Sequence, residues 1–128
     1  MKLLIDTNVL LWTMNGSRQL SRRANLAIQD LRNEAFVSVG SIWEAAIKYR
    51  SGRLPQASAL LLDTAQVLSN LKFTPLPLQV EHAKLAGLLA NSHKDPFDRM
   101  IAAQAILEGL TLVSSDAVFD SMAVTRLW

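Results

Sequence analysis

The fold is decided by the first stretch of the chain, MKLLIDTN, which covers residues 1–8. Its apolar run at residues 3–5 predicts a buried strand, and the following Asp6-Thr7-Asn8 favours the start of a helix, which we expect to run through residues 9–14. The charge at Asp6 ends the apolar run too early for a signal peptide or a membrane-spanning helix. We therefore expect a strand that leads directly into a helix, in a soluble cytoplasmic protein without a membrane anchor.

The same alternation of strand and helix continues along the rest of the chain. Further strands are expected at residues 35–39 and 110–113, with a last edge strand at 124–127. Residues 73–78 contain two prolines and are expected to form a short strand or an extended connection. Helices are expected at 20–32, 41–52, 57–71, 81–90 and 95–108. Strands that alternate with helices predict an α/β fold, a three-layer sandwich in which a central, mostly parallel sheet is flanked by helices. Residues 1–128 are expected to form a single domain, because their number suits one core and no linker or low-complexity tract divides them.

Composition excludes several classes of chemistry. The chain has no cysteine, so it can form no disulfide, thiolate metal site or thiol nucleophile, which suits a reducing cytoplasm. It contains neither a GxxxxGK[ST] loop nor a GxGxxG turn, and no Gly-x-Ser-x-Gly elbow. Nucleotide-triphosphate, dinucleotide and α/β-hydrolase chemistry therefore lack their characteristic motifs.

Four acidic residues stand where strands are expected to end or helices to begin: Asp6, Glu44, Asp98 and Asp116. In an open α/β sheet the carboxyl ends of the strands face one crevice, so residues far apart in sequence can meet there. Carboxylates gathered in one place repel each other and resist ionisation unless a cation sits among them. The sequence therefore predicts a divalent-metal site.

Each of these acids also has a purely structural explanation. The pattern Ser41-Ile42-Trp43-Glu44 matches a capping box, in which Glu44 would bond back to the Ser41 amide. Asp95 is expected to cap the helix that Pro96 begins, where Asp98 would favour the positive end of the helix dipole. Asp6 is a possible cap of the first helix, and Asp116 a turn residue. Capping alone does not explain an acid at the end of nearly every predicted strand.

The histidine, aromatic and basic residues of the chain can be explained by structural or surface roles. His82 and His93 lack ligand-like spacing and are expected at the surface rather than on a metal. Trp12, Trp43 and Phe97 are interpreted as core or interface aromatics. The formal charge is only +2, but a basic group lies near the acidic motifs in sequence, where it would suit a phosphate backbone or simply serve solubility: Lys48, Arg50, Arg53, Lys94 and Arg99.

Four ordered blocks give the chain a family resemblance. These are residues 6–12 (DTNVLLW), Ser38-x-x-Ser41-x-Trp43-Glu44, residues 95–105 (DPFDRMIAAQA) and Ser114-Ser115-Asp116. Together they closely resemble the PIN-domain family, and within it the VapC-type toxins of toxin-antitoxin pairs. The resemblance spans the whole chain. It implies an endoribonuclease that depends on Mg²⁺ or Mn²⁺, acts on RNA and is held inactive by a cognate antitoxin protein.

By motif, the resemblance assigns the acidic constellation to Asp6, Glu44, Asp98 and Asp116. Hard divalent cations prefer oxygen ligands, and Mg²⁺ usually takes only one or two carboxylates directly. We expect Asp6 and Asp98 to be direct ligands, and Glu44 and Asp116 to bind a second ion or to position water. We expect Thr7, Asn8 and Ser114 to form hydrogen bonds that orient the acidic ligands. Ser114 stands where relatives often have threonine, so a hydroxyl group is kept. Arg99 is expected either to make a weak contact with the substrate phosphate or to form a structural ion pair.

Two other functions remain as alternatives. A non-catalytic binding protein would receive a partner's Arg or Lys in the acidic pocket. An acidic phosphotransfer receiver or phosphatase would want a partner acid two residues after its Asp nucleophile, and the chain has Asn8 there. The apolar helices around Trp43 and at residues 57–71 suit a homodimer face or an antitoxin groove.

Overall fold

The computed structural model describes the whole chain, from Met1 to Trp128. Its centre is a five-stranded sheet in the order β3-β2-β1-β4-β5, and every neighbouring pair is parallel. The strands are β1 (Lys2–Ile5), β2 (Glu34–Ser38), β3 (Phe73–Leu76), β4 (Thr111–Val113) and β5 (Arg126–Leu127). All the predicted strands are present, and the sheet expected to be mostly parallel is entirely so.

Helices connect the strands. They are α1 (Thr7–Asn15), α2 (Arg22–Gln29), α3 (Val39–Arg50), α4 (Ser58–Leu62), α5 (Thr64–Leu71), α6 (Val80–Leu88) and α7 (Pro96–Glu108), with short 3₁₀ turns at Pro55–Ala57 and Ala117–Ser121. The single helix expected at 57–71 is wrong: Asp63 leaves helical geometry at φ −147° and ψ 73°, and its side chain accepts the Gln66 N–H to begin α5. No helix combines the length and the apolar character needed to cross a membrane.

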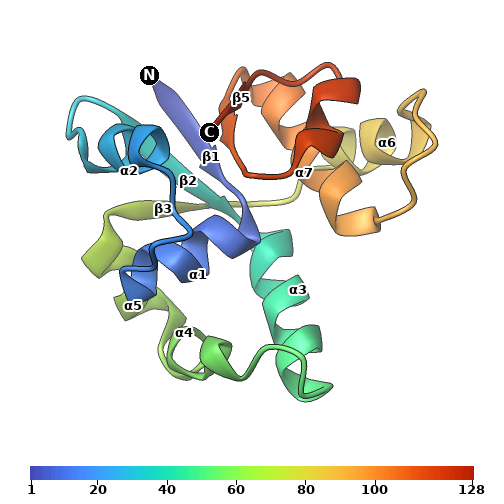
Figure 1. Cartoon of the computed structure of the whole chain (residues 1–128). Coiled ribbons are helices and arrows are strands. Elements are labelled where there is room, and N and C mark those ends of the chain that lie inside the picture. The colour runs from blue at the N-terminus through green and yellow to red at the C-terminus, as the bar shows by residue number, and fades with distance from the viewer.

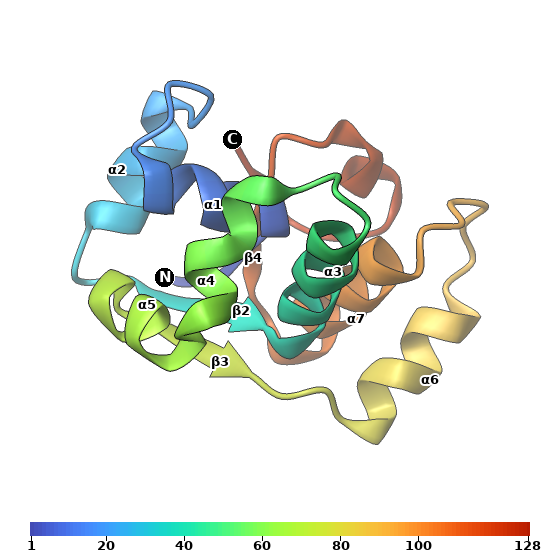
Figure 2. The same ribbon diagram turned by 90° about the horizontal axis from the view of Figure 1, so that it is seen from below.

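The helices cover both faces of the sheet, as the three-layer prediction requires. Side chains of β1 alternate between two cores, because successive residues of a strand point to opposite faces. Leu3 and Ile5 join one core with α1, α4 and α5, whereas Leu4 joins the other with α7 and the 3₁₀ turn around Phe119. Figure 1 shows α1, α4 and α5 gathered together and α6 beside α7 on another side, and Figure 2 keeps the same separation after a 90° turn.

The order of the strands fixes where a site can form. From the central β1 the chain first moves to β2 and β3, then returns through α6 and α7 to place β4 on the other side of β1. The carboxyl ends of β1 and β4 therefore flank the point where the strand order reverses, which is where open α/β sheets bind their ligands. Asp6 follows β1 directly, and Ser114 follows β4.

Candidate active site

Asp6 is held rigidly at the end of β1. Its backbone N–H continues the sheet by donating to the Val113 carbonyl at 3.1 Å, and its side chain caps α1. One carboxylate oxygen accepts the Thr7 N–H at 2.8 Å, and the other accepts the Ser114 hydroxyl at 2.7 Å. Asp6 is only 8% exposed, and this burial raises the pKa of its carboxyl group to about 6. The hydrogen bonds from Ser114 and Thr7 lower the pKa, whereas the negative charges of Asp98 and Glu44 raise it further.

Glu44 lies on α3 and is only 5% exposed. Its Oε1 accepts the Thr7 hydroxyl at 2.6 Å, and its Oε2 accepts the Lys48 ammonium at 2.8 Å. A buried carboxylate needs such donors because it has lost its hydration. Thr7, the first residue of α1, is thus linked to Glu44 on α3, 37 positions further along the chain.

The capping box predicted for Ser41 and Glu44 is wrong. Helix α3 begins at Val39, and its cap is Ser38, whose hydroxyl accepts the Gly40 N–H at 3.0 Å. Ser41 therefore lies inside the first turn, and its buried hydroxyl has no hydrogen-bond partner. Both oxygens of Glu44 are bonded to side chains, so the capping explanation for this acid no longer applies.

Asp98 lies in the first turn of α7. Its Oδ2 is 2.8 Å from His93 Nε2, and burial raises the pKa of the Asp98 carboxyl, which the His93 contact opposes. The charges of Asp95 and Glu44 raise it further. Asp95 caps α7 as predicted, accepting the Phe97 and Asp98 N–H groups at 2.9 and 3.2 Å.

Asp116 stands on the open side of the site. It is exposed, its N–H donates to the Ser114 hydroxyl at 3.1 Å, and its Oδ1 accepts the Val118 N–H at 3.0 Å. Ser114 therefore joins the ends of β1 and β4, because the same hydroxyl that donates to Asp6 accepts from Asp116. The turn role anticipated for Asp116 coexists with its place at the site.

These residues enclose one small pocket of about 140 Å³ that has no hydrophobic lining. It is lined by Asp6, Thr7, Asn8, Glu44, Lys48, Asp95, Asp98 and Asp116. The pocket brings together all four acids of the predicted constellation, with Thr7 and Asn8, while Ser114 stands behind Asp6. Sequence reasoning missed Asp95 as a lining acid and did not single out Lys48, although the spacing of Lys48 from Glu44 places both on one face of α3.

The donor chemistry of the pocket fits a hard divalent cation. All its acidic ligands are oxygens, and the mutual repulsion that helps to raise the pKa values of Asp6 and Asp98 would be relieved by a positive ion. Nowhere in the chain do three His, Cys, Asp or Glu side chains converge closely enough to ligate one ion together. The acids therefore do not form a complete set of ligands for one ion, and a bound Mg²⁺ would keep water in the rest of its coordination shell.

Arg99, considered for phosphate contact, has a different role. Its guanidinium donates to the carbonyls of Ala86, Leu89 and Asn91 at 2.8 Å each and to that of His93 at 3.0 Å. Those carbonyls belong to the end of α6 and the loop before α7, so Arg99 fixes the loop that carries His93. It is neither directed at the pocket nor part of an ion pair.

The expectation of a surface position is wrong for His82, whereas His93 keeps 28% of its side chain exposed. His82 is only 1% exposed: its Nδ1 accepts the Gln79 N–H at 2.9 Å, so its Nε2 carries the proton towards Glu108 at 2.8 Å. His93 is partly buried against Asp98. A lone histidine in a sequence gives no periodic signal. The loop that places His93 is held by Arg99 and by a local bond in which Asn91 Oδ1 accepts the His93 N–H at 2.8 Å.

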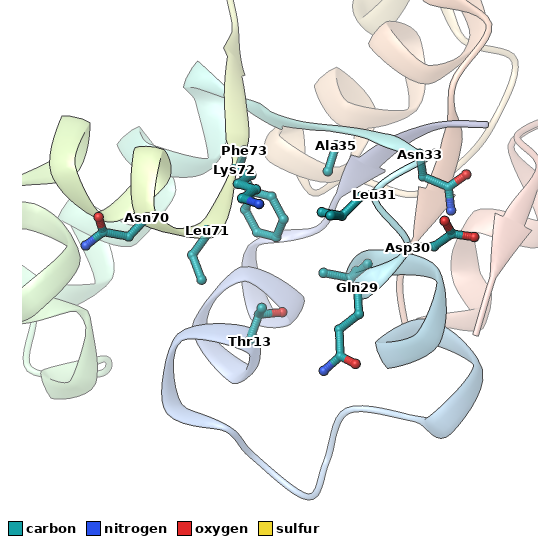
Figure 3. Close-up of a pocket in the computed structure, with 11 residues that line it drawn as sticks. Thr13, Gln29, Asp30, Leu31, Asn33, Ala35, Asn70, Leu71, Lys72 and Phe73 are labelled. Carbon is teal, nitrogen blue, oxygen red and sulfur yellow. The ribbon is translucent and has the colours of Figure 1, made fainter.

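A second hollow, of about 280 Å³, lies at the opposite end of the strands (Figure 3). Ala35 and Phe73, which stand at the amino ends of β2 and β3, line it together with residues from α1 and from the ends of α2 and α5. Its one acid, Asp30, is partly exposed and paired with Arg32 at 2.8 Å. It therefore lacks the carboxylate cluster of the smaller pocket.

Comparison with known proteins agrees with this architecture. The family model of the PIN domain matches residues 3–124, so the chain belongs to the PIN domain family. A search of curated protein sequences finds no significant match.

Solved structures share the fold at low sequence identity. VapBC-1 from nontypeable Haemophilus influenzae has a TM-score of 0.71 at 15% identity, covering 99% of this chain and 97% of that one. VapBC2 from Rickettsia felis, bound to a DNA fragment from its promoter, has a TM-score of 0.70 at 17% identity, covering 99% and 98%. VapC20 from Mycobacterium tuberculosis, described as a sarcin-ricin loop cleaving toxin, has 0.67 at 15% identity and covers 98% of each chain.

Proposed function

We propose that the chain is an endoribonuclease that depends on Mg²⁺ or Mn²⁺ and cleaves RNA phosphodiester bonds at the acidic pocket. The observation that supports this most directly is the meeting of Asp6, Glu44, Asp98 and Asp116, from four separate parts of the chain, around one wholly polar hollow. Membership of the PIN domain family and the likeness to a toxin described as cleaving the sarcin-ricin loop point to the same chemistry.

The pocket offers a distinct task to each residue. Asp6 and Asp98 are the proposed direct metal ligands, and Glu44 and Asp116 would hold a second ion or orient water. The bound ion would help a water molecule lose its proton and would stabilise the leaving oxygen. Thr7 and Ser114 fix the orientations of Glu44 and Asp6 through their hydroxyl groups, and Asn8 also lines the pocket.

The raised pKa of Asp6 affects how a cation would bind to the pocket at different pH values. With a pKa of about 6, Asp6 keeps its proton at mildly acidic pH unless a cation favours the charged form. Cation binding and proton release are therefore coupled at this residue. We expect weaker metal binding below pH 6, with Asp98, whose pKa is also raised, acting in the same direction.

We further propose that the protein is the toxin of a toxin-antitoxin pair in the cytoplasm. The structures from Rickettsia felis and Haemophilus influenzae are VapBC complexes, and several others are described as toxin-antitoxin or FitAB assemblies. An antitoxin would block the pocket with a cationic side chain. The observation that favours this is that the pocket already accepts one ammonium group, that of Lys48 on Glu44.

A homodimer is the oligomeric state that we propose. Val39, Trp43 and Ile47 are exposed one turn apart along α3, and Trp43 is 60% exposed with its ring packed edge-on against Phe97 at 5.1 Å. Such an aliphatic and aromatic stripe is unfavourable in water and is typical of contact surfaces. Pairing across α3 would place two acidic pockets near the same interface.

The rival function is that of a non-catalytic protein whose pocket only receives a partner's Arg or Lys. Purified protein decides between the two: we expect RNA cleavage with Mg²⁺ or Mn²⁺, none with excess EDTA, and none from a folded Asp98→Asn variant. Undiminished cleavage in EDTA by protein free of contaminating nuclease would remove the metal mechanism.

The toxin role has a separate test in cells. Expression of the protein alone should arrest growth, and co-expression of a neighbouring small protein should relieve the arrest. An active nuclease that is harmless at high expression would remove the toxin role.

A further inference from the structure

Lys48 is the only basic residue that lines the acidic pocket. It lies one helical turn after Glu44, and its ammonium group is 2.8 Å from Glu44 Oε2. The two partners differ in freedom, because the Glu44 side chain is 7% exposed whereas the Lys48 side chain is 35% exposed. Glu44 is also fixed by the Thr7 hydroxyl, so Lys48 is the partner that can move.

The pocket needs a countercharge before it can accept a phosphodiester. Five carboxylates line it, those of Asp6, Glu44, Asp95, Asp98 and Asp116, against the single ammonium of Lys48. An RNA phosphate approaching this surface is repelled unless cations lie close to its oxygens. Arg99 cannot serve, because its N–H groups hold four backbone carbonyls.

We infer that Lys48 is a substrate-binding residue whose ammonium group leaves Glu44 for a non-bridging oxygen of the RNA phosphate when the nucleic acid enters the pocket. The inference rests on the proposed nuclease function and adds a phosphate ligand to it. Exchanging one anionic oxygen for another keeps the ammonium group paired throughout. The flexible four-carbon stem of lysine suits such a movement, because it carries a point charge without demanding a fixed two-pronged geometry.

The competing explanation is that Lys48 only forms an intrahelical salt bridge with Glu44 on the surface of α3. A Glu followed by Lys four residues later is the favourable orientation of such a pair on a helix. That role concerns the fold and the charge of Glu44 alone. It predicts no effect of Lys48 on the salt dependence of RNA binding.

Binding without cleavage separates the two roles. A fluorescein-labelled single-stranded RNA of mixed sequence is titrated by fluorescence anisotropy with Ca²⁺ in place of Mg²⁺, so that a divalent cation can neutralise the carboxylates. The titration is repeated at several concentrations of monovalent salt, against wild type, Lys48→Ala, Lys48→Met and Lys48→Arg. We expect the two uncharged variants to reduce the slope of log K against log salt by about 0.7, the contribution of one phosphate contact on a single strand. Lys48→Arg should keep the slope, and Lys48→Met preserves the aliphatic stem if Lys48→Ala folds poorly.

Lys2→Ala is the matched control, since it removes the same charge at the amino end of β1, whose carboxyl end carries Asp6. It should leave the slope unchanged. An unchanged slope in both Lys48→Ala and Lys48→Met would overturn the role of Lys48 while leaving the nuclease proposal intact. Wild-type protein that neither binds nor cleaves RNA would instead overturn the nuclease proposal, and the inference with it.

Discussion

Replacing Asp6 by asparagine should stabilise the metal-free protein at neutral pH while abolishing cleavage. The pKa of Asp6 rises from the ordinary 3.8 to about 6 on folding, so the folded protein holds this proton more tightly than the unfolded chain. Stability therefore falls as pH rises from about 4 to about 6 and stays reduced above that range. The carboxylate is buried, so solvent screens little of this cost.

The magnitude follows from that difference in pKa. Each tenfold change in proton affinity corresponds to about 1.4 kcal/mol, so the ionised Asp6 costs the fold about 3 kcal/mol at pH 7. Asparagine removes the charge but offers only one oxygen to the Thr7 N–H and the Ser114 hydroxyl, which forfeits about 1 kcal/mol of hydrogen bonding. We expect Asp6→Asn to raise the free energy of unfolding by about 2 kcal/mol.

Urea denaturation in EDTA at pH 7 and pH 4 measures this effect. The advantage of Asp6→Asn should largely vanish at pH 4, where the wild-type carboxyl is protonated in the folded state, and saturating Mg²⁺ should stabilise only the wild type. Asp63→Asn is the matched control, because Asp63 also caps a helix but is exposed, and asparagine caps as well as aspartate. An Asp6→Asn variant less stable than wild type at both pH values would refute the reasoning.

Four further substitutions test the acidic pocket and the elements that hold it. Glu44→Gln keeps an oxygen for the Thr7 hydroxyl, so it should change stability by no more than about 1 kcal/mol yet abolish metal-dependent cleavage in RNase assays. Ser38→Ala should cost about 1 kcal/mol in urea denaturation because Ser38 caps α3, whereas Ser41→Ala should be neutral or stabilising because that hydroxyl has no partner. Arg99→Lys should lower stability by about 2 kcal/mol, since one ammonium cannot bond four carbonyls, and should slow cleavage by loosening the loop that carries His93; unchanged melting temperature and rate would contradict this.

The sequence predicted the sheet well because its strands carry strong local signals. The apolar run at residues 3–5 ends at a capping acid, and the run at 110–113 ends at Ser114-Ser115-Asp116, so both central strands and their carboxyl ends could be located. The helix at 57–71 was predicted as continuous because the apolar pattern of these residues runs without a break. The break at Asp63 was not anticipated, although aspartate is a favoured helix cap.

The four acidic residues of the pocket could be predicted from the sequence, whereas their hydrogen-bond partners could not. Topology alone brings the residues after β1 and β4 together, and the spacing along α3 shows that Glu44 and Lys48 share a face. The start of α3 was misplaced because Ser38 and Ser41 are both competent caps, and only packing decides between them. His93 reaches Asp98 through a loop that Arg99 orders by carbonyl contacts, a tertiary arrangement with no sequence period.

The charge of the donors around the acids decides which carboxylate oxygens are open to a cation, because each oxygen has a second lone pair. Asp6 accepts only from neutral donors, the Thr7 N–H and the Ser114 hydroxyl. Both oxygens of Glu44 are bonded, one to Thr7 and the other to Lys48. Asp98 accepts from His93 at Oδ2 alone, which leaves its Oδ1 without a protein partner. A cation can therefore approach Asp98 Oδ1 without breaking a hydrogen bond, whereas full access to Glu44 Oε2 requires Lys48 to leave. In the proposed mechanism, cation binding at Asp98 and release of Lys48 from Glu44 would thus be separable events, and the second would free the ammonium group for an incoming phosphate.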